Sequence, residues 1–103
     1  MWFKRIFIQD EKRIMNIKET KRYIKSYNKR AYKLKVKIFE TLTKFVNNPF
    51  HKDLRNHSLK WKLKWIRSMN VTWDYRILFR ELSNWTYELV ELLDINSHSN
   101  LYK

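Results

Sequence analysis

The stretch Asp74-Tyr75-Arg76-Ile77-Leu78-Phe79-Arg80 predicts a strand, because polar and large apolar side chains alternate along most of it. In a strand, successive side chains point to opposite faces, so Tyr75, Ile77 and Phe79 would share one face and the charged groups the other. The mostly apolar run at residues 86–95 is long enough for a neighbouring central strand. A turn at Ser97-His98-Ser99-Asn100 would end it.

Upstream of these strands the periodicity is helical. Residues 14–17 read as a short strand, and Thr20 is placed to cap a helix that carries Tyr23, Ile24 and Tyr27. A second helix is expected at 32–46, with an apolar stripe of Leu34, Ile38, Leu42 and Phe45, and it would end at Asn47-Asn48-Pro49. From Leu59 onward the period changes to two. The order predicts an α+β fold, in which an N-terminal strand and two helices pack on a small twisted antiparallel sheet.

The length of 103 residues predicts one domain. Residues 1–13 show no clear period, so we expect an N-terminal extension over 1–14 that need not belong to the core, and a single domain over 15–103. Met15 is an alternative start. The apolar segments are shorter than the ~20 residues of a membrane span. With no cysteine, the expectation is a soluble cytoplasmic protein without membrane association.

The chain is strongly basic, with a formal net charge of +13. Eighteen Lys and Arg but three acids fall between Lys12 and Arg67, whereas acids outnumber bases after Trp73. Eight cations crowd the predicted helical region: Lys21, Arg22, Lys25, Lys29, Arg30, Lys33, Lys35 and Lys37. They could be a solvated helical face. Their density favours a polyanion, either ribosomal RNA or an acidic protein segment.

Four segments together resemble the RelE/YafQ-like toxins of the RelE/ParE superfamily, type II toxin–antitoxin mRNA interferases. In order, they are Asn48-Pro49-Phe50-His51, Leu54-Arg55-Asn56-His57-Ser58-Leu59-Lys60, Asp74-Tyr75-Arg76-Ile77-Leu78-Phe79 and Ser97-His98-Ser99-Asn100-Leu101-Tyr102. The resemblance implies a RelE-like fold and a toxin that enters the ribosomal A site and cuts mRNA without a metal or other cofactor. It also implies a cognate antitoxin that neutralises the toxin by wrapping its surface.

The resemblance places the family's site residues at His57, Asp74, Tyr75, His98 and Tyr102, with Arg76 at the phosphate-binding arginine. Two positions depart from the YafQ-like pattern. Asn70 stands where a second histidine is expected, which puts a YafQ-specific mechanism in doubt. Asn96 stands where a glycine precedes the terminal turn, a mild change because asparagine tolerates the left-handed region.

Cleavage by the substrate's own 2′-OH needs a base, an acid for the leaving 5′-oxygen, and cations for the phosphorane charge. We assign His98 as the acid and either His57 or Asp74 as the base. Arg67 and Arg76 would clamp the phosphate. Tyr75 and Tyr102 could stack on a splayed base, although Tyr75 is equally suited to the core. Lys60, Lys62 and Lys64 would contact the RNA backbone.

Glycine is absent and tryptophan occurs five times, whereas average usage predicts about seven glycines. Trp61, Trp65, Trp73 and Trp85 stand where the resembled family commonly has glycine. One hypothesis is that the source gene reads UGA as glycine and that the sequence was translated with UGA as tryptophan. The tryptophans would then be strained wherever φ is positive.

Three other functions fit parts of the pattern. A ParE-like toxin would inhibit DNA gyrase without nuclease chemistry, although His57, Asp74 and His98 argue for an acid–base set. A non-catalytic basic RNA-binding domain needs only the alternation of cations with apolar residues. Asn70 leaves room for an inactive remnant.

Overall fold

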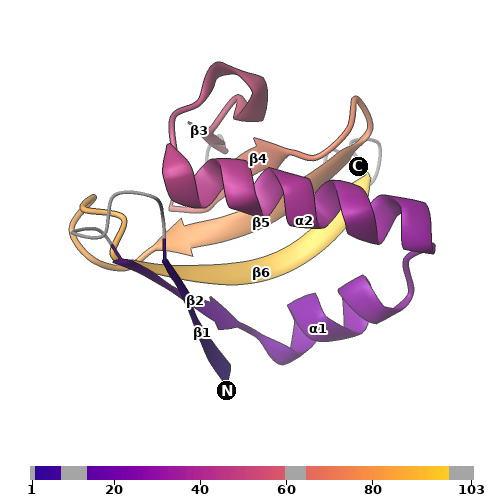
Figure 1. Ribbon diagram of the computed structural model, residues 1–103, viewed down its shortest axis with the longest axis horizontal. Helices are drawn as coiled ribbons and strands as arrows, with labels where there is room; N and C mark the ends of the chain where they lie inside the picture. The colour runs from indigo at the N-terminus through magenta and orange to yellow at the C-terminus, as the bar shows by residue number, and fades with distance from the viewer. Residues whose placement is uncertain (1, 8–13, 60–64, 98–103) are drawn as a thin grey trace.

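The computed structural model describes residues 2–7, 14–59 and 65–97. Strands β1 (Trp2–Phe7) and β2 (Ile14–Glu19) come first, followed by helices α1 (Lys21–Asn28) and α2 (Tyr32–Asn47). A 3-10 turn, η1 (Lys52–Leu54), and the short strand β3 (His57–Ser58) lead to β4 (Arg67–Asn70), β5 (Tyr75–Glu81) and β6 (Leu89–Ser97). The α+β fold class is thus confirmed (Figure 1).

The sheet has the strand order β1-β2-β6-β5-β4-β3. Its pairs are antiparallel except β2 and β6, which run parallel, so the sheet is mixed rather than purely antiparallel as expected. A parallel pair requires a long crossover, and the helical pair supplies it between β2 and the later strands. Sequence periodicity predicts strands but not their directions.

Helix α2 lies across one face of the sheet and forms the core with it (Figure 1). Ile38 and Phe45 of its apolar stripe are fully buried, and Phe45 meets Phe79 of β5 edge-to-face at 5.1 Å between ring centroids. Met69 and Ile77 pack in the same cluster. The helix ends at Asn47, as the Asn-Asn-Pro sequence predicts.

Helix α1 lies beside β6, where it takes over the sheet edge beyond the end of β2. The hydroxyl of Thr20 accepts a hydrogen bond from the Tyr23 N–H at 3.1 Å, which confirms the predicted cap. The same hydroxyl donates to the carbonyl of Leu92 at 2.9 Å, and Ser26 donates to the carbonyl of Ile95 at 2.7 Å. Thr20 and the side chains of α1 therefore hydrogen-bond to carbonyls along the edge of β6 where the pairing with β2 ends.

Two segments differ from their predicted structure. The run 86–95 does not begin as a strand, because Asn84, Trp85 and Tyr87 have positive φ and form a loop before Leu89. The backbone of residues 2–7, for which the sequence showed no period, pairs with β2. Within residues 59–67, Trp65 lies in a turn and the Leu59 N–H donates to the Ile66 carbonyl at 2.8 Å; the intervening positions 60–64 lie outside the described residues.

Candidate nucleic-acid interface

The strand register assigns each predicted residue to one of two faces of the sheet. Phe79 contacts α2, so Met69 and Ile77, which share its face, also point toward the helices. The opposite face, here called the far face, carries Ser68, Asn70, Arg76, Leu78, Asp94 and Asn96 of β4, β5 and β6. Its central positions are polar, although Ser68 is fully buried.

His57 stands at the β3 end of the far face, since it pairs directly with Ser68. Its ring is exposed, and its Nδ1 lies 2.7 Å from the carbonyl oxygen of Arg55. A carbonyl can only accept, so Nδ1 carries the proton in this hydrogen bond and a neutral ring keeps its lone pair on Nε2. Nε2 is therefore the atom that can act as a base.

Arg76 lies at the centre of the far face, between Asn70 on β4 and Asn96 on β6. Its Nη1 donates to the Asn70 side-chain oxygen at 2.8 Å, and its buried Nε has no hydrogen-bond partner among the described residues. In the sequence, Asn70 is only a departure from the YafQ-like pattern. In the structure, the Asn70 side chain holds the Arg76 guanidinium through this hydrogen bond, a role that no sequence signal indicated.

Asp74 and Tyr75 follow the turn between β4 and β5. The Thr72 hydroxyl accepts from both of their N–H groups, at 3.3 and 3.0 Å. Tyr75 shares the helix-facing side with Ile77 and packs against the core, with the Arg30 guanidinium carbon 5.3 Å from its ring centroid. Its ring is thus already in contact on one side, which favours the core alternative over base stacking.

Arg67 lies on the helix-facing side, opposite to Arg76, because it has the strand parity of Met69. Its Nε donates to the Asn56 side-chain oxygen at 2.7 Å, and its guanidinium lies 5.5 Å from the Trp85 ring centroid. Asn56 also donates to Pro49 and to the Tyr87 hydroxyl. The structure therefore does not bring the two arginines together as one clamp. Arg67 instead hydrogen-bonds to Asn56, in the segment that precedes His57.

The remaining predicted site residues lie outside the described residues: His98, Tyr102, Lys60, Lys62 and Lys64. The described chain ends at Ser97, which pairs with Tyr75. Asn96 lies within β6 and not in a left-handed turn. Within residues 14–59 and 65–97, no cluster of three metal-ligating side chains occurs, and no helix is long and apolar enough to cross a membrane.

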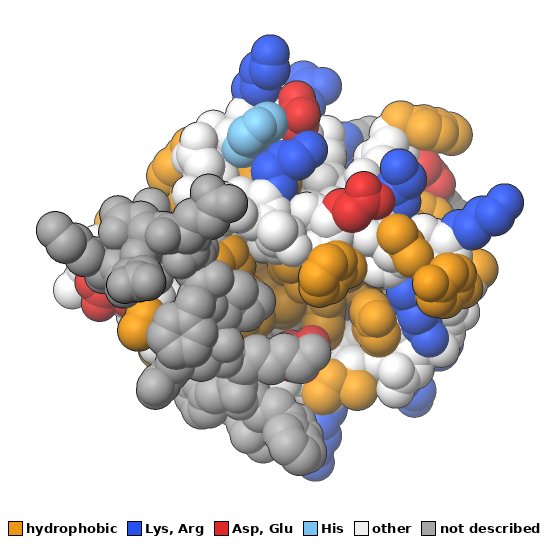
Figure 2. Space-filling model, viewed as in Figure 1, with side chains coloured by type: hydrophobic (Ala, Val, Ile, Leu, Met, Phe, Trp, Pro, Cys, Tyr) orange, Lys and Arg blue, Asp and Glu red, His pale blue; other side chains and the backbone are white. Residues whose placement is uncertain are grey.

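An apolar groove separates α1 from α2, and Figure 2 shows hydrophobic side chains gathered along the middle of this face. It encloses about 390 Å³ and is lined by Glu19, Tyr23, Tyr27, Ile38, Phe39 and Leu42 among others. Burial raises the pKa of the Tyr23 phenol far above its ordinary value, and the nearby Glu19 carboxylate adds to the rise. The Glu19 carboxylate is thus the charged group of a lining that otherwise consists of apolar and neutral side chains.

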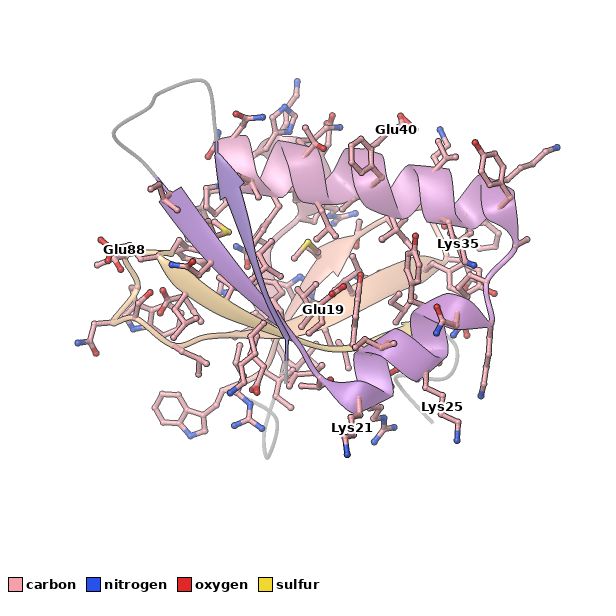
Figure 3. The ribbon with its side chains drawn as sticks, turned by 60° about the horizontal axis from the view of Figure 1, so that its bottom comes forward. Glu19, Lys21, Lys25, Lys35, Glu40 and Glu88 are labelled. Atoms are coloured by element: carbon pink, nitrogen blue, oxygen red, sulfur yellow. The ribbon has the colours of Figure 1, made fainter. Side chains whose placement is uncertain are left out.

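A cation borders this groove, because Lys35 extends over the ring of Tyr27 at 5.2 Å. Lys21 and Lys25 leave α1 on the side turned away from α2, so they lie outside the groove (Figure 3). Most of the eight predicted helical cations are exposed. The sequence thus predicted the basic helical surface but not the apolar groove within it, because the groove forms only when the two helices meet.

Comparison with solved structures identifies the fold. The chain is similar to a YoeB/ParE toxin from Agrobacterium tumefaciens, at 16% identity over 80% of this chain and 97% of that one, with a TM-score of 0.65. It is also similar to YafQ from Escherichia coli, at 16% identity over 86% of this chain and 99% of that one, with a TM-score of 0.62. A third similar structure is the toxin–antitoxin complex RelBE2 from Mycobacterium tuberculosis, at 15% identity over 81% of this chain and 90% of that one, with a TM-score of 0.65. No protein-family model and no curated protein matches the chain. At these identities the likeness shows the fold alone, which is that of the RelE-like toxins.

Proposed function

We propose that this chain, which has the RelE-like toxin fold, is the toxin of a type II toxin–antitoxin pair and a ribosome-dependent mRNA endonuclease. It would inhibit translation by cutting mRNA in the ribosomal A site. The observation that carries this proposal is the far face itself, where the register sets His57 and Arg76 on one side of the sheet.

The two groups are spaced to act on one phosphodiester. They are two strand spacings and two residues apart, about 12 Å between Cα atoms at about 4.8 Å per strand and 3.3 Å per residue. An imidazole and a long arginine side chain can both reach a phosphate that lies between them. Asn70 holds the arginine in place for this contact.

The reaction needs no atom beyond those of the RNA and these side chains. His57 Nε2 takes the proton of the 2′-OH, the 2′-oxygen bonds to the adjacent phosphorus, and the bond to the 5′-oxygen breaks. The products are a 2′,3′-cyclic phosphate and a 5′-hydroxyl, whose proton comes from the general acid that we assign to His98. Arg76 stabilises the negative charge that develops on the phosphorane oxygens. Asp74 is the alternative base.

The test is cleavage mapping of mRNA on translating ribosomes. We expect cuts in codon register, a roughly 10²- to 10⁴-fold loss in His57→Ala and His98→Ala, and a comparable loss in Arg76→Ala. Arg80→Ala is the matched control, because Arg80 shares the strand and face of Arg76 but lies 3.9 Å from the Glu91 carboxylate. His51→Gln controls for the loss of a histidine.

Other outcomes separate the rival functions. Intact mRNA together with impaired gyrase supercoiling would assign the protein to the gyrase-inhibiting class. RNA binding without cleavage would leave a non-catalytic RNA-binding domain. Cleavage that persists in both histidine variants would reject the acid–base assignment but not the nuclease.

We also propose that the partner is an antitoxin that places an acidic amphipathic helix in the groove between α1 and α2. The groove has a mostly apolar lining, and Lys35 beside Tyr27 together with the net charge of +13 favours acidic flanks. Phe39 is 70% exposed and lines the groove, whereas Tyr32 is 79% exposed on the same helix outside it. Co-expression with the product of the adjacent gene should rescue growth in cells making wild-type or Tyr32→Glu toxin, and fail to do so for Phe39→Glu. Equal rescue of all three would place the antitoxin elsewhere.

A further inference from the structure

A polar hollow of about 360 Å³ lies between α1 and β6, separate from the apolar groove. Its lining includes four cations, Arg22, Lys25, Lys29 and Arg30, against one carboxylate, Asp94, and the amide of Asn96. At about 30 Å³ per water, the hollow has room for on the order of ten waters. A phosphate group with part of its sugar fits in that space.

Two residues that line the hollow, Asp94 and Asn96, belong to the far face that carries the proposed catalytic groups. Asp94 pairs with Leu78 and Asn96 pairs with Arg76, so both line the hollow from the far face of the sheet. His57, Ser68, Leu78 and Asp94 form one row across four strands, about 14 Å long at about 4.8 Å per strand. Asn96 thus stands between Arg76 and the cations of α1.

The charges in the hollow are arranged to leave a positive excess. Asp94 is buried, and Arg22 neutralises it through a hydrogen bond of 3.1 Å from Nε. Arg30 donates to Ser26 and to the Ile95 carbonyl, yet its buried Nε has no partner among the described residues. Lys25 and Lys29 are exposed at the opening. Lys25, Lys29 and Arg30 would therefore attract an anion.

We propose that this hollow binds a backbone phosphate of the same RNA strand that is cut beside Arg76. It would hold the strand across β6, so that the scissile phosphate lies in register with His57 and Arg76. The proposal rests on the proposed function, since it extends the far-face track to α1. An RNA backbone is favoured over an acidic peptide because the hollow is polar and offers few apolar contacts for a peptide side chain.

The experiment measures how salt weakens binding of a fluorescent RNA 12-mer with 2′-O-methyl riboses, which lacks the attacking hydroxyl. Each phosphate contact on a single strand contributes about 0.7 to the slope of log K against log salt. Lys25→Gln/Lys29→Gln removes the contact with this one phosphate and should lower the slope by about 0.7, which is about 2.6-fold less loss of affinity between 50 and 200 mM salt. Lys33→Gln/Lys37→Gln removes the same charge from exposed positions of α2 outside the hollow, and should leave the slope unchanged.

Each outcome separates this inference from the function on which it rests. Equal slopes in the two double variants, with wild-type protein still cutting mRNA on ribosomes, would remove the phosphate site and leave the nuclease. If Lys25→Gln/Lys29→Gln weakens the binding of a polyglutamate peptide but leaves the salt slope for RNA unchanged, the hollow binds an acidic protein segment and the inference is overturned. Wild-type protein that neither binds the 12-mer nor cuts mRNA would overturn both.

Discussion

The guanidinium carbon of Arg30 lies 5.3 Å from the centroid of the Tyr75 ring, within the range of a cation–π contact. The same guanidinium donates to the Ile95 carbonyl at 3.0 Å. Arg30 therefore ties the end of α1 to both β5 and β6. This contact gives Tyr75 a structural role on the helix-facing side of the sheet.

Tyr75→Phe should preserve cleavage, because the ring and its contact with Arg30 remain. Tyr75→Ala should lower the free energy of unfolding by about 2 kcal/mol, less than for a fully buried aromatic, because Tyr75 is half-buried. Urea denaturation and cleavage assays on the two variants measure these effects. A Tyr75→Phe protein of normal stability that no longer cuts mRNA would instead give the hydroxyl a direct part in catalysis.

Asn70 should behave as a positioning residue for Arg76. Asn70→Ala removes the oxygen that accepts the Arg76 Nη1 hydrogen bond, so we expect cleavage to fall roughly 10- to 100-fold through misplacement of the guanidinium. Asn70→Asp keeps an acceptor at that position and should restore part of the rate. Single-turnover cleavage measures the three proteins; a rate in Asn70→Asp no higher than in Asn70→Ala would contradict the positioning role.

Glu81 should make stability depend on acid pH. Burial opposes its charge, but hydrogen bonds from the Ser83 hydroxyl and from the N–H groups of Trp85, Ser83 and Tyr87 outweigh burial and hold its pKa below the ordinary value. A carboxyl with a lowered pKa in the folded state stabilises the protein above its unfolded pKa of about 4.3, and this stability disappears as pH falls through the folded pKa.

Glu81→Gln tests this linkage. At pH 7 the variant should be less stable by about 1–2 kcal/mol, the value of hydrogen bonds to a charged acceptor. The difference from wild type should shrink as pH falls from about 4.3 through the lower pKa of folded Glu81, because below that pKa the carboxyl is neutral like the amide. Urea midpoints between pH 3 and pH 7 measure it, and a difference that stays constant over this range would exclude Glu81 as its source.

Trp85 and Trp73 should respond oppositely to glycine. Trp85 has φ of 67°, a left-handed conformation that costs a non-glycine residue about 1–2 kcal/mol, whereas Trp73 has no positive φ and is 90% exposed. Trp85→Gly should therefore raise the unfolding free energy by up to about 1 kcal/mol after loss of the Arg67 contact. Trp73→Gly should lower it by about 0.5 kcal/mol through chain entropy.

Thermal unfolding compares these variants, and destabilisation by Trp85→Gly would show that no strain is relieved.

The glycine-codon hypothesis is tested separately, by reading the codons. UGG at the tryptophan positions would end it. The positive φ of Trp85 is expected if the native residue there is glycine, whereas Trp65 and Trp73 do not have positive φ.

Local patterns in the sequence were sufficient for most elements of the fold. The Thr20 cap, the stripe from Leu34 to Phe45 and the alternation at residues 74–80 each depend on neighbours within a few residues, and the structure confirms them. The sequence pattern did not predict the loop at residues 82–88. The Glu81 carboxylate accepts hydrogen bonds from N–H groups up to six residues away, and these bonds hold the chain in a loop although its apolar residues favour a strand.

Patterns in the sequence indicate the fold class, the basic character of the helices and the presence of histidines and arginines suited to RNA cleavage. Which of these side chains share a face depends on how the strands pair in the folded chain. Strand register places Arg76 with His57 and directs Arg67 to the other side, and it makes Asn70 the partner of Arg76. Register and the parallel pairing of β2 with β6 come from contacts between distant segments, whose geometry no local periodicity contains.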